Sequence, residues 1–241
     1  MTFGLSIFTC REFRMVKTAA ALALAALSGV LAQEPLRYMP FGDSITDYGC
    51  WRPWLAEKLK EDGYTLEFVG SRQAQATCND LDYDRDHEGH PGFQAVDIVK
   101  DNQLVGWLND NPADIITMHL GTVDIVRSST KADLIIEAYS TLVDQMRDNN
   151  PAMRIIVAQI IPFPANDRLV QDLNAAIPKW AASKNTTESP IWVVDQYTGF
   201  SGTTDLYDGL HPSESGDVKI SEKFYPAMVQ AIQSLVGGRD E

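Results

Sequence analysis

Apolar and β-branched residues gather in five short runs along the chain, and each run has the length of a β-strand. The runs cover residues 36–41, 65–70, 114–120, 154–161 and 191–195. The third and fourth, DIITMHL and RIIVAQII, are almost continuously apolar, which is typical of strands buried on both faces of a parallel sheet. The pattern therefore predicts a parallel sheet with covered central strands.

Helical periodicity fills the stretches between these runs and follows the last of them. The predicted helices cover residues 51–62, 94–109, 131–149, 167–184 and 215–236. Strands that alternate with helices form βαβ units, so the chain is expected to be an α/β protein. We predict a three-layer α/β/α sandwich of flavodoxin-like type, with a five-stranded parallel sheet. Because no repeat or linker interrupts the pattern, residues 33–241 are expected to form a single domain.

Functional residues of such a fold gather at the carboxyl ends of the strands. The segments that follow the predicted strands are residues 42–49, 71–92, 121–124, 162–166 and 196–212. The search for chemistry is confined to these five segments.

The N-terminal 32 residues have the pattern of a secretory signal peptide. Residues 15–32 start with a basic segment, continue as the apolar stretch AAALALAALSGVLA and end on small residues. Cleavage is expected before Gln33, and Met15 is a possible true start. The apolar stretch is too short and too rich in alanine to span a membrane. The sequence therefore predicts a secreted, extracellular protein.

Composition and charge narrow the choice of partner. The 241 residues carry a net charge of −13, with 44% hydrophobic and 22% charged residues. Such an acidic chain is not expected to bind nucleic acid or an anionic membrane. We expect a monomer that acts on neutral material.

Two cysteines remain once the predicted leader is removed. An even pair in a secreted chain predicts one disulfide, here between Cys50 and Cys78. Each follows a predicted strand, so both are expected near the same sheet edge. Asn185 begins the only N-glycosylation sequon, Asn-Thr-Thr, and is a candidate glycan site.

Three residues in two of these segments suggest nucleophilic catalysis. Ser44 follows the first strand within the sequence GDSIT, where a hydroxyl could equally cap a helix. Asp208 and His211 lie three residues apart on one loop, so the carboxylate can orient the imidazole. Either feature alone is weak evidence. Together, at one sheet edge, they predict a Ser-His-Asp hydrolase with Ser44 as nucleophile.

These motifs resemble those of the SGNH (GDSL-type) hydrolases. GDSIT and DGLHP match the first and last blocks of that superfamily, HEGHPGF resembles the second, and HLGTVDI stands where the third has Gly-x-Asn-Asp. The details around GDSIT, CWR and DHEGHPG resemble carbohydrate esterase family 3. That family includes acetylxylan esterases, and its fungal members are often described as cellulose-binding proteins.

The resemblance implies an oxyanion hole with one unusual position. It assigns the backbone N–H groups of Ser44 and Gly92 to the hole. The family's third donor is an asparagine side chain, but this chain has Val123 there. Valine has no donor, and losing one such donor typically costs about 10²–10³ in turnover. A slow esterase, a compensating group, or a protein that has shifted toward binding are the alternatives.

Two further features favour structural roles. Residues 79–90 are rich in acidic side chains and histidine, but their spacing fits neither an EF-hand loop nor a zinc motif. We expect a solvated acidic loop with a capping role and no metal site. Trp51 and Trp54 are expected in the core, and Asp124 is expected to be a structural hydrogen-bonding group.

The sequence thus predicts a carboxylic ester hydrolase that needs no cofactor. The resemblance implies acetylated plant cell-wall polysaccharide, such as xylan, as the substrate. The alternatives are a non-catalytic carbohydrate-binding protein on an esterase scaffold and a lysophospholipase or thioesterase.

Overall fold

All five predicted runs form strands of one sheet in the computed structural model, which describes residues 1–2, 34–73, 78, 81 and 83–237. The strands are β1 Leu36–Gly42, β2 Leu66–Phe68, β5 Ile115–His119, β6 Arg154–Gln159 and β7 Ile191–Asp195. They are parallel and lie in the order β2-β1-β5-β6-β7. This is the flavodoxin-like order, whose ligand-binding crevice lies between β1 and the strand after it in the sheet, here β5. The predicted fold class is confirmed.

The predicted count of five strands is wrong for the described residues, because two short strands were missed. They are β3 Arg72–Gln73 and β4 Asp86–Gly89. β2 pairs with the first half of β1, and β4 takes over beside its last two residues. β3 pairs antiparallel with β4. The sequence DHEG gave no strand signal because its polar side chains are buried through contacts with distant residues.

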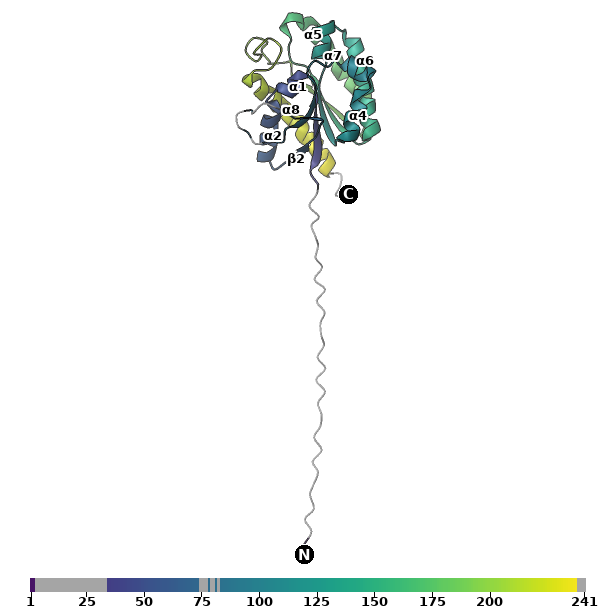
Figure 1. The fold of residues 1–241 in the computed structure, drawn as a ribbon, viewed down its shortest axis with the longest axis vertical. Coiled ribbons are helices and arrows are strands. Elements are labelled where there is room, and N and C mark those ends of the chain that lie inside the picture. Colours follow the sequence, from purple (N-terminus) through teal and green to yellow (C-terminus); the bar gives the residue numbers. More distant parts are fainter. Residues whose placement is uncertain (3–33, 74–77, 79–80, 82, 238–241) are drawn as a thin grey trace. The chain divides into compact units, whose positions relative to one another are not determined.

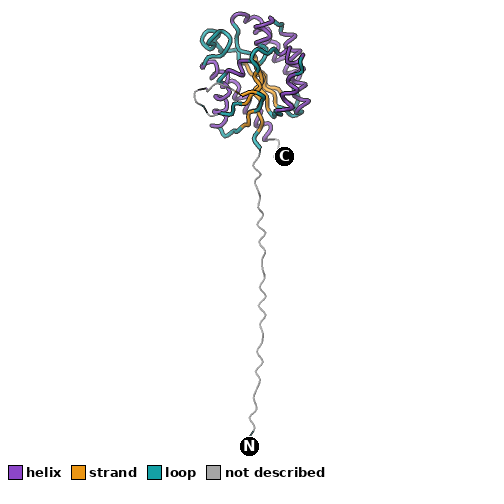
Figure 2. Tube along the Cα trace, viewed as in Figure 1, coloured by secondary structure: helices purple, strands orange, loops and turns teal. Residues whose placement is uncertain are grey.

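Helices cover both faces of the sheet, as Figures 1 and 2 show. They are α1 Ser44–Tyr48, α2 Trp51–Glu61, α3 Ala95–Lys100, α4 Gln103–Asp110, α5 Thr122–Ser128, α6 Ala132–Asn149, α7 Asp167–Lys184 and α8 Glu214–Val236, with a 3-10 turn at Pro164–Asn166. The helix predicted over 94–109 is broken in two, because Asn102 adopts a left-handed conformation with φ 51°. The short helices α1 and α5 were not predicted.

Alternate residues of the strands face two separate cores. In β1, Met39 and Phe41 join the core under α3, α4, α6 and α7, whereas Tyr38 joins the one under α2 and α8. Trp51 lies in the second core with 1% of its surface exposed, as predicted. Trp54 is only partly buried and belongs to neither core, so its predicted core position is wrong.

The predicted signal peptide and the possible start at Met15 fall within residues 3–33, outside the described residues. Within the described part of the chain, no helix is both long enough and apolar enough to cross a lipid bilayer.

Candidate active site

The site is built on α1, a helix of five residues that follows β1 directly. Gly42 ends β1 and pairs in register with Gly89 of β4. A Cβ on Gly42 would lie 2.3 Å from Thr46 Oγ1, and one on Gly89 would lie 2.7 Å from the Asp47 amide nitrogen. Two adjacent glycines therefore let α1 pack directly on the end of the sheet.

Asp43, and not Ser44, caps this helix. Asp43 Oδ1 accepts a hydrogen bond from Ile45 N–H at 2.9 Å, and its carbonyl accepts from Thr46 and Asp47. Ser44 is the first helical residue, and among the described residues its N–H has no hydrogen-bond partner. Because Asp43 provides the cap, the hydroxyl of Ser44 is not used for capping and its amide stays free to meet a ligand.

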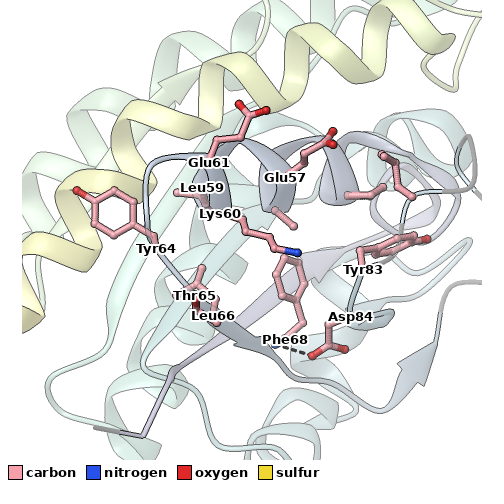
Figure 3. A pocket seen from close by; sticks show the side chains of 13 residues that line it. Glu57, Leu59, Lys60, Glu61, Tyr64, Thr65, Leu66, Phe68, Tyr83 and Asp84 are labelled. Carbon is pink, nitrogen blue, oxygen red and sulfur yellow. Dashed lines mark hydrogen bonds between the residues drawn. The ribbon is translucent and has the colours of Figure 1, made fainter. Parts of the chain in front are cut away.

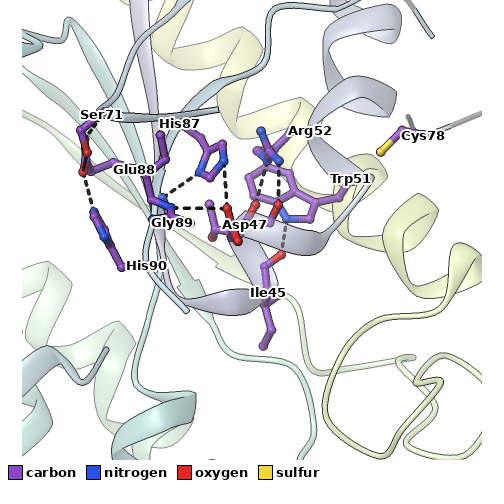
Figure 4. A network of polar contacts seen from close by, with 12 residues as sticks. Ile45, Asp47, Trp51, Arg52, Ser71, Cys78, His87, Glu88, Gly89 and His90 are labelled. Carbon is purple, nitrogen blue, oxygen red and sulfur yellow. Dashed lines mark hydrogen bonds and ion pairs between the residues drawn. The ribbon is translucent and has the colours of Figure 1, made fainter. Parts of the chain in front are cut away.

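The other end of α1 is held by the CWR sequence. A helix this short leaves its last carbonyls without helical partners. Trp51 Nε1 donates to the Ile45 carbonyl at 3.1 Å. Arg52 donates from Nε to the Thr46 carbonyl at 2.8 Å and from Nη2 to the Asp47 carbonyl at 3.1 Å. Figure 4 shows this arrangement. The buried Trp51 and Arg52 side chains thereby fix the orientation of Ser44.

A disulfide joins Cys50, the N-cap of α2, to Cys78, and this confirms the predicted pairing. Their Cα atoms lie 5.4 Å apart, and 28 positions separate the two residues in the sequence. Closing a loop of this length stabilises a fold by about 3–4 kcal/mol in the chain-entropy model. The bond ties Cys78 to the start of α2, the helix that supports α1.

Ser44, His211 and Asp208 form one continuous chain of hydrogen bonds. Ser44 Oγ lies 2.9 Å from His211 Nε2, and His211 Nδ1 lies 2.7 Å from Asp208 Oδ2. Because an ionised carboxylate only accepts, Nδ1 carries the proton and Nε2 accepts from the serine hydroxyl. This tautomer is the one a general base for Ser44 requires.

The carboxylate of Asp208 is held in its charged form. Its other oxygen, Oδ1, accepts from the amides of Leu210 and His211 at 3.0 and 2.7 Å. Burial favours the protonated acid, but the amide and imidazole of His211 and the amide of Leu210 outweigh it and lower the pKa of Asp208. The Asp208 side chain remains 41% exposed.

The loop that carries this pair is braced by Asp205, which the sequence analysis missed. Asp205 is almost fully buried and accepts from Ser201 N–H, Ser215 Oγ and Lys219 Nζ. A β-bridge between Leu206 and Pro212 closes the loop, and Tyr207 N–H donates to the His211 carbonyl at 3.0 Å. No motif marked Asp205, because its partners come from two parts of the chain, the preceding loop and α8.

Gly92 lies on a tight turn next to the end of β4. Phe93 N–H donates to the His90 carbonyl across this turn, and Gly92 has φ +81°, which favours glycine. Within the described residues the Gly92 N–H has no hydrogen-bond partner. A Cβ here would lie 2.6 Å from Nη2 of Arg127, so this guanidinium packs directly against Gly92. The sequence analysis did not single out Arg127.

Asp124 ties the start of α3, which follows this turn, to α5. Its carboxylate accepts from Ala95 N–H at 2.8 Å and from Val96 N–H at 3.2 Å, at the start of α3. Burial raises the pKa of Asp124 to about 6, although these two amides favour its charge. Asp124 is therefore a structural hydrogen-bonding residue, in the role expected for it.

Val123 is the neighbour of Asp124 on α5 and has 6% of its surface exposed. Its side chain is apolar and its backbone lies near the cap of α1. Burial raises the pKa of Asp43 to about 7, while the amides of Ile45 and Val123 favour the ionised carboxylate. The HLGTVDI segment thus offers the backbone amide of Val123 to Asp43, but it has no side-chain donor at position 123.

Comparisons with known proteins agree with this geometry. Residues 41–218 match the model of the GDSL-like Lipase/Acylhydrolase family. The chain belongs to this family. A carbohydrate esterase of family 3 from Talaromyces cellulolyticus is 37% identical, with a TM-score of 0.79 over 82% of this chain and 98% of the other. A serine-to-alanine mutant of an acetyl esterase, solved with an acetate ion, is 36% identical, with a TM-score of 0.78 over 83% and 99%.

More distant relatives share less of the sequence. A family 3 carbohydrate esterase from Clostridium thermocellum is 28% identical, with a TM-score of 0.73 over 84% of this chain and 99% of that one. A protein of Acetivibrio thermocellus that carries the name endoglucanase X is 29% identical over 138 residues. This match spans 56% of the present chain and 59% of the relative. The scaffold of this GDSL-type protein is therefore similar to those of family 3 carbohydrate esterases, and its family supports carboxylic ester hydrolysis.

The acidic segment of this GDSL-type chain is not the solvated loop that we expected, at least over residues 86–90. His87 and Glu88 are fully buried and His90 nearly so. His87 Nδ1 accepts from Gly89 N–H at 3.0 Å, and its Nε2 lies 3.2 Å from Asp47 Oδ1 (Figure 4). Burial lowers the pKa of His87 far below its usual value, and the nearby Arg52 and Arg72 act in the same direction. Among the described residues, no group of three or more potential ligands could hold a metal ion.

A pocket of about 590 Å³ opens between α2 and β2, away from these residues (Figure 3). Its walls include Lys60, Tyr64, Phe68 and Asp84, but not Ser44, Asp208 or His211.

Asn185 is exposed at the end of α7, and its Oδ1 accepts from Ile191 N–H at 2.7 Å. Its use as a glycan site stays a prediction.

Proposed function

We propose that this protein is a secreted, monomeric serine esterase that removes acetyl groups from plant cell-wall polysaccharide such as xylan. The observation that carries the proposal is the unbroken hydrogen-bond chain from Ser44 through His211 to Asp208. The likeness to acetyl esterases and family 3 carbohydrate esterases over almost their whole length supports the acetyl group as the acyl part.

The side chains then act in fixed roles. Ser44 Oγ attacks the acetyl carbonyl while His211 Nε2 takes the hydroxyl proton. The imidazolium is stabilised by the ionised Asp208 and passes its proton to the departing sugar hydroxyl. His211 next takes a proton from water, whose oxygen attacks the acetylated Ser44. As the bond between the acetyl carbon and Ser44 Oγ breaks, His211 returns the proton to Ser44 Oγ and acetate leaves. The steps use only these side chains and water, and no cofactor.

The negative charge that develops on the carbonyl oxygen needs donors. Two amides of the described chain are unpaired at this position of the fold, Ser44 N–H and Gly92 N–H. Because Val123 supplies no third donor, we expect a slow enzyme. Loss of one oxyanion-hole donor typically lowers turnover by about 10²–10³.

Val123 also favours a second candidate function, non-catalytic carbohydrate binding. A scaffold that has lost one donor could retain affinity for the polysaccharide while turning it over poorly. This alternative predicts binding that does not depend on the Ser44 hydroxyl.

One experiment separates the two candidates. The purified protein and its Ser44→Ala variant are incubated with acetylated xylan, and released acetate is quantified beside a cellulose pull-down. Acetate release by the parent alone supports the esterase. Cellulose binding with no acetate release from either protein contradicts it and favours the binding protein.

A further inference from the structure

Two tyrosine rings project into solvent beside His211. Among the described residues, Tyr48 and Tyr207 are the only aromatic side chains that are largely exposed, at 51% and 65%. The ring centroids of Tyr48 and His211 lie 5.6 Å apart, and those of Tyr207 and His211 lie 5.8 Å apart. Both exposed aromatic residues thus lie at the same imidazole.

Each tyrosine stands on a rigid part of the site. Tyr48 is the last residue of α1, whose carbonyls are held by Trp51 and Arg52. Tyr207 lies within the bridged loop, and its N–H donates to the His211 carbonyl at 3.0 Å. Little conformational freedom is left to lose when a ligand binds, and this favours affinity.

Exposure of two large rings is unfavourable unless something covers them. Tyrosine combines a flat apolar face with a hydroxyl that hydrogen-bonds, so it suits ligands that are apolar on one side and polar at the edge. A pyranose ring has this character, with axial C–H groups on its faces and hydroxyls around its rim. It carries no charge, which fits a chain with a net charge of −13.

We propose that Tyr48 and Tyr207 form a binding platform for the sugar ring that carries the acetyl group. The platform rests on the proposed function, because the sugar is the alcohol part of the ester that Ser44 attacks. Stacking of the sugar ring beside His211 would bring its acetyl carbonyl toward Ser44 Oγ, which lies 2.9 Å from His211 Nε2. The platform selects for acetylated pyranosides over simple acetyl esters.

Two substrates test the selectivity. Vinyl acetate presents the acetyl group without a ring, and acetylated xylotriose presents it on a pyranose. Tyr48→Ala and Tyr207→Ala should each lower kcat/KM for acetylated xylotriose about tenfold, mainly through KM, and lower it less than about threefold for vinyl acetate. Tyr→Phe at either position should restore most of the activity on the sugar ester. Equal losses on both substrates would instead mean that the tyrosines only position His211, and would overturn the platform.

Sugar binding without catalysis gives a second, independent measurement. Titration calorimetry of the Ser44→Ala protein with xylotriose should show binding that weakens at least about tenfold in the Tyr48→Ala/Tyr207→Ala background. Leu134→Ala is the matched control, because Leu134 is also 51% exposed but lies on α6. It should leave binding unchanged. Absence of binding, or equal binding with and without the tyrosines, would overturn the platform. Retention of full hydrolysis by Ser44→Ala would instead refute the proposed function, and the titration would still decide the platform.

Discussion

Within the described residues, two groups of a serine, a histidine and a carboxylate differ in which member stands in the middle. In the Ser44 group, His211 stands between the serine and Asp208. In the second group, Glu88 stands in the middle. Ser71 Oγ donates to its Oε1 at 2.6 Å, and His90 Nε2 lies 2.5 Å from the same oxygen (Figure 4).

The surroundings of the two groups differ as much as their order. The Ser44 group opens to solvent, with 15% of the His211 side chain and 41% of the Asp208 side chain exposed. Glu88 is fully buried, and the His90 ring stacks on Trp107 with centroids 4.0 Å apart. A histidine that is hydrogen-bonded to both the serine and the acid can take the serine proton and share its charge with the acid. A carboxylate in the middle instead accepts hydrogen bonds from the serine and the histidine and holds them together. Under the proposed function, the same residue types therefore serve catalysis in the Ser44 group, whereas in the Glu88 group they join buried segments of the fold.

Removal of the Ser44 hydroxyl is the largest expected effect on activity. Ser44→Ala should lower kcat on acetyl esters by at least about 10³-fold, because no nucleophile remains at His211. The midpoint of thermal unfolding should stay within a few degrees of the parent. Acetate release at the parental rate would remove Ser44 from the proposed mechanism.

Removal of the central acid of the second group should instead cost stability. Glu88→Ala leaves Ser71 N–H, Ser71 Oγ and His90 Nε2 without their acceptor. We expect the free energy of unfolding in urea to fall by about 3 kcal/mol, because removal of a shared acceptor leaves several buried hydrogen-bonding groups without a partner. The exposed Glu67→Ala on β2 is the control, with an expected loss below about 0.5 kcal/mol. Equal losses for the two variants would contradict the assignment of Glu88 as a structural centre.

One substitution can add the missing side-chain donor to the proposed oxyanion hole of the Ser44 group. Val123→Asn should raise kcat by about tenfold to several hundredfold, because the new amide N–H could reach the developing negative charge. Val126→Asn is the matched control, since it makes the same exchange at an exposed position of the same helix. Turnover that does not rise in a folded Val123→Asn protein would mean that another group, such as the Arg127 guanidinium beside Gly92, already completes the hole.

The smallest effect is expected for the serine of the second group. Ser71→Ala removes one hydrogen bond to Glu88 and should lower the free energy of unfolding by about 1 kcal/mol. Turnover should stay at the parental value, since Ser71 contacts no member of the Ser44 group. Comparison of Ser44→Ala and Ser71→Ala in one activity assay tests directly whether the order of the residues decides their roles. A loss of turnover shared by both would contradict it.

Several features of this protein followed from the sequence by itself. The continuous apolar runs of β5 and β6 marked central strands, because a strand covered on both faces needs apolar side chains at every position. The spacing of Asp208 and His211 placed them within reach of each other on one loop. The presence of a single cysteine pair outside the predicted leader left only one disulfide partner for Cys50.

Other features depended on contacts that only the tertiary structure provides. β4 is polar in sequence and largely buried in the fold, because Ser71 and Asp47, from other segments, contact its Glu88 and His87 side chains. The short helix α1 is stabilised because the Trp51 and Arg52 side chains donate hydrogen bonds to its last carbonyls. The local sequence pattern likewise does not show whether a tyrosine is buried, like Tyr38, or exposed, like Tyr207. Exposure is decided by what packs against a residue from elsewhere in the chain, and that is a property of the assembled fold.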